Sequence, residues 1–139
     1  IFGQESSFGN YGGPRGQLGR ITDQIGAIVG RNVSAGVTQI RLSSINPKVK
    51  EFFKIKATSD LFEVSKSSIA TMSLLLDIYT NNIPKNQKNQ YKELTALHYN
   101  NPKEFKNAIK NHQKKIDNGY VKKVMKYSKN VRVYVGNYK

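Results

Sequence analysis

The region between Ser65 and Asn81 carries the longest helical periodicity in the chain and constrains the fold more than any other feature. Its apolar side chains recur at spacings of three or four residues, so they share one broad face of a helix. These side chains are Ile69, Met72, Leu75, Leu76 and Tyr79. The sequence Asn-Asn-Ile-Pro at 81–84 ends the pattern. We therefore expect a helix over residues 65–81 as the longest element of a mostly α chain.

Two Asn-Pro pairs mark the starts of further helices, because asparagine caps the free N–H groups of a first turn and proline fits that turn. Asn46-Pro47 precedes a short helix, and Asn101-Pro102 precedes a longer one. The apolar side chains expected on the second of these helices are Phe105, Ile109 and Ile116. A further helix is predicted over residues 18–29, in a region that also holds a glycine-rich loop at 9–19.

The C-terminal region predicts one more helix and a strand. Asp117 is placed to cap the helix, which would turn its apolar residues inward. These residues are Tyr120, Val121, Val124 and Tyr127. The stretch Val131 to Val135 is β-branched and partly alternating, which predicts a short strand. The expected fold class is thus mainly α, a small globular domain with a short C-terminal β-strand.

Length and composition set further bounds. The 139 residues fit a single domain over 1–139, and the chain begins with Ile1, which indicates a processed piece of a longer protein. The longest apolar stretch, Ile69 to Tyr79, is too short to span a bilayer. The net charge of +14 predicts attraction to polyanions, namely nucleic acid, anionic lipid or an acidic cell-wall polymer.

The chain offers little for a metal or cofactor. It has no cysteine, which excludes disulfides and thiolate–metal sites. Its two histidines, His98 and His112, do not have the spacing to carboxylates that zinc sites use. The glycine-rich loop lacks the Gly-Lys-Ser/Thr ending of a phosphate-binding loop. We expect no metal and no cofactor.

Three short stretches follow one another along the chain: Glu-Ser-Ser-Phe-Gly at 5–9, Ser-Ala-Gly-Val-Thr-Gln-Ile at 34–40 and Ala-Leu-His-Tyr-Asn-Asn at 96–101. This order resembles the soluble lytic transglycosylases and goose-type lysozymes of glycoside hydrolase family 23. The pattern of that family begins with Glu-Ser-x-Phe, continues with a Gly-Leu-Met-Gln-like strand or turn, and later has Ala-Tyr-Asn-x-Gly. The stretch at 119–127 also looks like the family's final helix. The resemblance implies a lysozyme-like fold.

The chain departs from the family pattern at four places. The gap between Glu5 and Gly36 is longer and includes the predicted helix at 18–29. Val37-Thr38 stands where the family has Leu-Met, and Asn101-Pro102 stands where it has x-Gly. Only four residues precede Glu5, so the helix that normally helps to bury the acid is nearly absent from this sequence.

The resemblance implies that Glu5 is a single general acid and base. It would protonate the leaving oxygen of the MurNAc-GlcNAc β-1,4 bond, then activate the 6-hydroxyl of the same MurNAc to give a 1,6-anhydro end. Such an acid needs a pKa raised by apolar surroundings. Ile1, Phe2 and Phe8 are close in sequence and could provide them, whereas nearby cations would oppose the shift.

Other site residues are carried over from the family by position. Gln39 would line the cleft and bond the acetamido or hydroxyl groups of the substrate. Tyr99 would orient the carboxylate of Glu5, and Asn100 would contact sugar or hold the loop. Ser6 matches the serine that follows the acid, where a structural role is the better interpretation. For Tyr99 taken alone, a core tyrosine with a bonded hydroxyl is the simpler reading.

Two other functions stay open. A hydrolytic goose-type lysozyme would use Asp23, in the inserted segment, as a second carboxylate, although Asp23 also fits the solvated face of a helix. A non-enzymatic nucleic-acid-binding module would explain the charge, the paired lysines and the eight tyrosines. Against it, the lysines are spread over amphipathic helices and only five cations are arginine, so nucleic acid is the disfavoured partner.

The expected cellular setting depends on the preferred function. Peptidoglycan glycan strands are the expected partner, together with a larger assembly or the remainder of a precursor chain. We expect the protein outside the cytoplasm, in the periplasm or cell wall, or on a phage virion. A cellular role would be wall remodelling or a secretion or conjugation apparatus.

Overall fold

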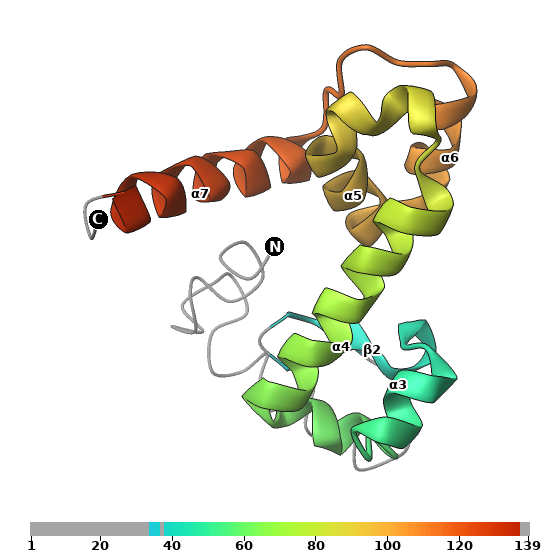
Figure 1. Ribbon diagram of the computed structural model, residues 1–139, viewed down its shortest axis with the longest axis vertical. Helices are drawn as coiled ribbons and strands as arrows, with labels where there is room; N and C mark the ends of the chain where they lie inside the picture. Colours follow the sequence, from blue (N-terminus) through green and yellow to red (C-terminus); the bar gives the residue numbers. More distant parts are fainter. Residues whose placement is uncertain (1–33, 37, 137–139) are drawn as a thin grey trace. The chain divides into compact units, whose positions relative to one another are not determined.

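The computed structural model describes residues 34–36 and 38–136, and these residues are mainly helical with a small two-stranded sheet (Figure 1). The strands are β1 (Ser34–Ala35) and β2 (Ile40–Arg41), and the helices are α3 (Pro47–Phe52), α4 (Val64–Asp77), α5 (Tyr91–Asn100), α6 (Pro102–Lys110) and α7 (Gly119–Gly136). Short 3₁₀ turns cover Leu42–Ser44, Thr58–Phe62 and Lys85–Gln90, and a π turn covers Ile78–Asn82. The predicted mainly α fold class is confirmed.

The contacts divide the described residues into two compact units, residues 34–76 and 77–136, and each is described by itself. A single domain over 1–139 stays a prediction. Among the residues that the structure describes, no helix is both long and apolar enough to cross a membrane, in agreement with the sequence.

The first unit is built around the β1–β2 hairpin. The two strands pair antiparallel, with Ala35 opposite Ile40. Both of these side chains belong to a buried cluster with residues from the following turns and from α4. The cluster contains Ala35, Ile40, Ile45, Ile55, Leu61 and Ala70. The predicted helix start at Asn46 is confirmed, since its side-chain oxygen accepts a 2.9 Å hydrogen bond from the backbone N–H of Lys48.

The hairpin turn is packed very closely against the rest of this unit. Gly36 has a φ of +74°, a conformation that side chains rarely adopt. A Cβ atom there would lie 2.1 Å from the carbonyl oxygen of Leu61 and 2.9 Å from the Cβ of Ser67. The turn is closed by a 3.1 Å hydrogen bond from the N–H of Gln39 to the carbonyl of Gly36. A side chain at position 36 would therefore force the hairpin turn away from the 3₁₀ turn that contains Leu61 and from α4.

The long helix forms largely where it was expected, but the broad apolar face that the periodicity predicts is not the face that is buried. The helix α4 runs over Val64–Asp77 and continues into the π turn. Its buried residues are small ones, Ser67, Ala70 and Thr71. Met72 and Leu76, from the predicted apolar face, are 66% and 65% exposed. The close approach of the hairpin turn explains this, because only small side chains leave room for it.

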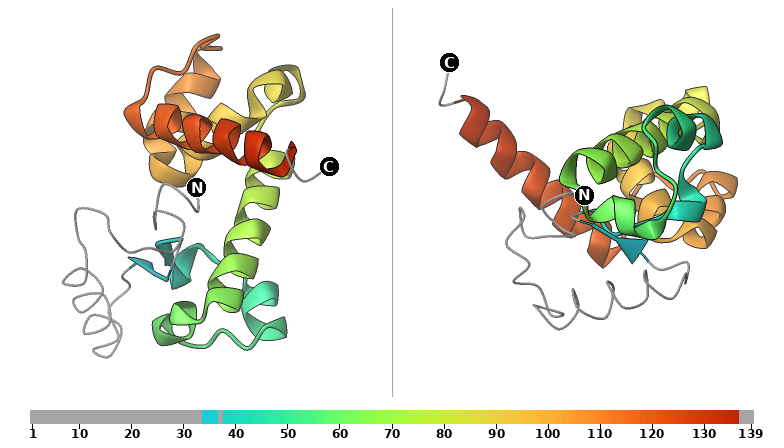
Figure 2. Two further views of the ribbon diagram at one scale, coloured as in Figure 1. Left: turned by 90° about the vertical axis from the view of Figure 1, so that its left-hand side faces the viewer. Right: turned by 90° about the horizontal axis from the view of Figure 1, so that it is seen from below.

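The second unit is a helical cluster in which α5 packs against both α6 and α7. Figures 1 and 2 show α5 and α6 side by side, with the first turns of α7 beside them and its later turns extending beyond. Its buried apolar residues are Ile78, Ile83, Leu94, Ala96, Leu97, Phe105, Ala108, Ile116, Val121 and Val124. Gln87 is buried as well, and its amide donates a 3.2 Å hydrogen bond to the carbonyl of Ile109.

Three details of the predicted C-terminal region are wrong. Asn118 caps α7, its side-chain oxygen accepting a 3.1 Å bond from the N–H of Val121, whereas Asp117 is exposed and forms an ion pair with Lys122. Ile116 is buried but lies beyond the end of α6.

The predicted strand at 131–135 is instead part of α7. No glycine or proline occurs between positions 120 and 135, so nothing interrupts the helical hydrogen bonds, and β-branched residues disfavour a helix only weakly.

Replacing Gly36 tests this packing. We expect Gly36→Ala to lower the free energy of unfolding by about 3 kcal/mol, because the left-handed backbone and the clash with Leu61 both penalise a methyl group. Gly119→Ala is the matched control. Nothing lies within 4 Å of a Cβ at Gly119, so its stability should stay within about 1 kcal/mol of wild type in urea unfolding. Equal effects of the two changes would contradict the packing described.

Candidate functional site

The residues predicted to do chemistry fall into different parts of the chain. Glu5, Ser6 and Asp23 lie outside the described residues, as does the predicted helix at 18–29. Gln39 belongs to the unit at residues 34–76. Tyr99 and Asn100 are neighbours on α5 in the unit at 77–136. The described parts of the candidate site are therefore the surroundings of the second and third motifs.

Gln39 lies in the hairpin turn between β1 and β2 and is half-buried. Its amide nitrogen donates a 3.1 Å hydrogen bond to the carbonyl of Gly36, and its amide oxygen accepts a 3.3 Å bond from the hydroxyl of Ser34. Its backbone is also left-handed, with a φ of 51°. The turn therefore fixes both ends of the Gln39 amide, which leaves it in one defined orientation.

Thr38, one of the residues at which the chain differs from the family pattern, is paired with a residue of α4. Thr38 is fully buried, and its hydroxyl accepts a 2.7 Å hydrogen bond from the hydroxyl of Thr71 on α4. A buried hydroxyl without a partner would be costly, so the two threonines stabilise the turn as a pair. Sequence reasoning missed this pair. A signal was available, because polar Thr38 stands where the family has an apolar residue.

The third motif ends helix α5 and starts α6. Tyr99 is half-buried and Asn100 is exposed, both in the last turn of α5. The backbone N–H of Asn101 donates a 2.7 Å bond to the carbonyl of Leu97, which closes α5. The side-chain oxygen of Asn101 accepts a 3.1 Å bond from the N–H of Glu104, which caps α6 as predicted.

Glu104 extends this junction to the start of α7. One of its carboxylate oxygens accepts hydrogen bonds from the side-chain amides of Asn101, at 3.2 Å, and Asn118, at 2.9 Å. The starts of α6 and α7 are thus joined through one carboxylate. Asn101-Pro102 differs from the family pattern, and it has a structural role here. It fixes the end of α5, the helix that carries Tyr99.

His98 lies next to Tyr99 and is half-buried. Its ring meets the ring of Phe105 edge-on, with a centroid separation of 4.6 Å. Burial lowers the pKa of His98, and nearby Lys106 acts in the same direction while Asp77 opposes it. The imidazole is therefore neutral at pH 7.

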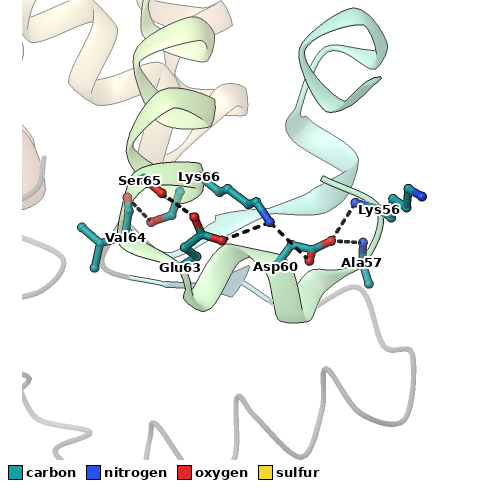
Figure 3. Close-up of polar contacts among 8 residues, drawn as sticks. Lys56, Ala57, Asp60, Glu63, Val64, Ser65 and Lys66 are labelled. Carbon is teal, nitrogen blue, oxygen red and sulfur yellow. Dashed lines mark hydrogen bonds and ion pairs between the residues drawn. The ribbon is translucent and has the colours of Figure 1, made fainter. Parts of the chain in front are cut away.

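A second polar cluster lies at the start of α4 (Figure 3). One carboxylate oxygen of Asp60 accepts hydrogen bonds from the backbone N–H groups of Ala57, at 2.9 Å, and Lys56, at 2.7 Å. Lys66 lies between two carboxylates, 3.8 Å from Asp60 and 3.0 Å from Glu63. These contacts hold the 3₁₀ turn at Thr58–Phe62 against the first turns of α4.

The electrostatics of this cluster do not suit a general acid. The N–H of Ala57, followed by that of Lys56, lowers the pKa of Asp60. The hydroxyl of Ser65 and then Lys66 lower the pKa of Glu63. Both carboxylates are ionised at neutral pH, so neither would hold the proton that a glycosidic oxygen needs.

Asp117 is in the same situation, because its bond to Lys122 lowers its pKa. Within residues 34–36 and 38–136, no three His, Cys, Asp or Glu side chains gather as metal ligands would. The candidate site residues that the structure describes are therefore Gln39 in the first unit and Tyr99 and Asn100 in the second.

No protein-family model, curated protein or solved structure matches this chain. The assignment of function consequently depends on the residues and contacts of the chain itself.

The lowered pKa of His98 predicts a pH dependence of folding. The unfolded state takes up the proton as the pH falls below about 6.5, before the folded state does. The free energy of unfolding should therefore decrease as the pH falls from about 6.5 through the lower folded pKa. In His98→Gln this decrease in the free energy of unfolding should be smaller, whereas His112→Gln retains His98 and should show the decrease caused by it. A pH profile of urea unfolding that is the same in wild type and His98→Gln would contradict the prediction.

Proposed function

We propose that the chain is a peptidoglycan lytic transglycosylase that cuts the MurNAc-GlcNAc β-1,4 bond. Glu5 is the single general acid and base, and the products carry 1,6-anhydro-MurNAc ends. No cofactor takes part. The observation that supports this most is the ordered set of three motifs. The second of them forms a tight turn closed by the hydrogen bond from the N–H of Gln39 to the carbonyl of Gly36.

Two of the four departures from the family pattern have structural partners within the chain. Thr38, in place of an apolar residue, is matched by the hydroxyl of Thr71. Asn101-Pro102 closes α5 and caps α6. Both changes therefore come with partners that keep the turn and the helix end in a defined geometry. Gln39 belongs to that turn, and Tyr99 to the last turn of α5.

The chemistry divides among these residues as follows. Glu5 donates its proton to the leaving oxygen as the bond breaks, while the N-acetyl group of the substrate assists at the anomeric carbon. The resulting carboxylate then takes the proton of the 6-hydroxyl, which closes the anhydro ring. Gln39 presents a fixed amide to acetamido or hydroxyl groups, Tyr99 orients Glu5, and Asn100 contacts sugar. Positioning of this kind lowers the barrier without a second carboxylate.

Digestion of purified peptidoglycan tests the proposal. Mass spectrometry of the released muropeptides should show 1,6-anhydro ends, about 18 mass units below the hydrolytic products because no water is added. Glu5→Gln should lower the rate at least about a hundredfold with the fold intact, since general acid–base catalysis contributes about that much. Glu51→Gln, which changes an exposed glutamate elsewhere in the chain, is the control and should cleave like wild type.

Two outcomes would contradict the proposal. Reducing-end muropeptides, lost in both Glu5→Gln and Asp23→Asn, would identify a hydrolytic goose-type lysozyme. If wild type releases no muropeptides and instead shifts DNA with a steep salt dependence, the chain is a nucleic-acid-binding module.

A further inference from the structure

The segment from Pro102 to Lys129, called here the lysine segment, carries an unusual excess of one charge. It includes α6, the loop that follows and the first part of α7. Its nine lysines are all exposed: Lys103, Lys106, Lys110, Lys114, Lys115, Lys122, Lys123, Lys126 and Lys129. Its two carboxylates are both engaged, Glu104 by Asn101 and Asn118, and Asp117 by Lys122.

Several lysines of the segment have like-charged neighbours on the helix surface. Lys122, Lys126 and Lys129 follow one another at spacings of four and three residues, so like charges are neighbours on the surface of α7. No acidic residue occurs in the first turn of α7, where the helix dipole favours a negative charge. Lys122 closes that turn and is paired with Asp117, which precedes the helix, whereas Lys123, Lys126 and Lys129 have no acidic residue near them in the sequence of α7. In α6, Lys103, Lys106 and Lys110 repeat the same like-charge spacing.

This arrangement differs from an ordinary solvated helix, in which lysines and glutamates alternate at such spacings and stabilise one another. The repulsion among these lysines is relieved when an anionic polymer lies along the helix, because its negative charges then lie beside them. The lysines in turn release the cations that are condensed on the polymer. Figures 1 and 2 show α7 extending beyond α5 and α6, which gives a linear polymer a helix to follow within this unit.

The side chains of the segment also limit which polyanion fits. No arginine occurs between positions 102 and 129, so the bidentate contacts that read base edges are absent from it. Phe105 is buried, Tyr120 and Tyr127 are half-buried, and His112 has the one exposed ring of the segment, so the segment offers little ring surface for successive bases to stack on. What remains is a row of hydrated point charges, which recognises repeating charge alone.

We propose that the lysine segment is a docking surface for the linear phosphodiester polymers that are attached to the wall glycan. This inference rests on the proposed function, because an enzyme that cuts that glycan meets those polymers on its substrate. The segment holds the enzyme on polymer-bearing wall, while the motifs that contain Glu5, Gln39 and Tyr99 act on the sugar.

Binding of poly(glycerol phosphate) to the whole chain, measured by calorimetry over a series of salt concentrations, tests the inference. A triple variant, Lys123→Gln, Lys126→Gln and Lys129→Gln, should bind at least about tenfold more weakly. The slope of log K against log salt should fall by about 2, since each lysine lost releases about 0.7 fewer counterions. The control variant changes three exposed lysines outside the segment, Lys48, Lys56 and Lys85, to Gln and thus loses the same charge. It should bind within about threefold of wild type.

Several results would overturn the inference. Equal weakening in both triple variants would mean that net charge alone drives binding. Absence of binding by wild type, or tighter binding of a DNA duplex with the same number of phosphates, would also exclude the proposed surface.

Cleavage assays separate this inference from the proposed function. On glycan stripped of phosphodiester polymer, both triple variants should cleave like wild type. On glycan that bears the polymer, the Lys123/Lys126/Lys129 variant alone should be slower. If wild type binds the polymer at this segment and yet cleaves no glycan, the proposed function fails while the docking surface stands.

Discussion

The close contact of Gly36 with the carbonyl of Leu61 and the side chain of Ser67 is the constraint on which the first unit depends. It brings the hairpin turn so near to α4 that the helix presents small residues to it. The same closeness places Thr38 within hydrogen-bonding distance of Thr71. A larger residue at either side of this contact would separate the turn from the helix and release the orientation of Gln39.

The sequence predicts well those features that local chemistry decides. The helix starts at Asn46 and Asn101 follow from the capping oxygen and the proline after it, and both are present in the structure. These helix starts depend on a few adjacent atoms, so the sequence predicts them without knowledge of the rest of the fold.

Features that depend on packing were predicted less well. Periodicity placed the largest apolar residues of α4 on one face, whereas contact with the turn buries small residues and leaves Met72 and Leu76 exposed. The cap of α7 is Asn118 and not its neighbour Asp117, and the side-chain amide of Asn118 also donates to Glu104. The residues at 131–135 continue a helix that has already formed, which outweighs their weak preference for a strand.

The proposed function makes one demand of the chain, that Glu5 hold a proton at neutral pH. The described carboxylates with shifted pKa values, Asp60, Glu63 and Asp117, are all held ionised by hydrogen bonds or lysines. An acid needs the opposite environment, one with apolar neighbours and few cations. In a chain of net charge +14, the proposal therefore requires that apolar neighbours of Glu5 outweigh the effect of nearby cations on its pKa.

The most direct test is a titration of Glu5 by NMR, with ¹³C in the side-chain carboxyl groups of the five glutamates. The resonance that disappears in Glu5→Gln identifies the residue, and Glu63 provides an internal comparison with a lowered pKa. The proposed function predicts that the pKa of Glu5 is raised to about 6, as a general acid requires. A pKa at or below about 4.3, the ordinary value for glutamate, would contradict it.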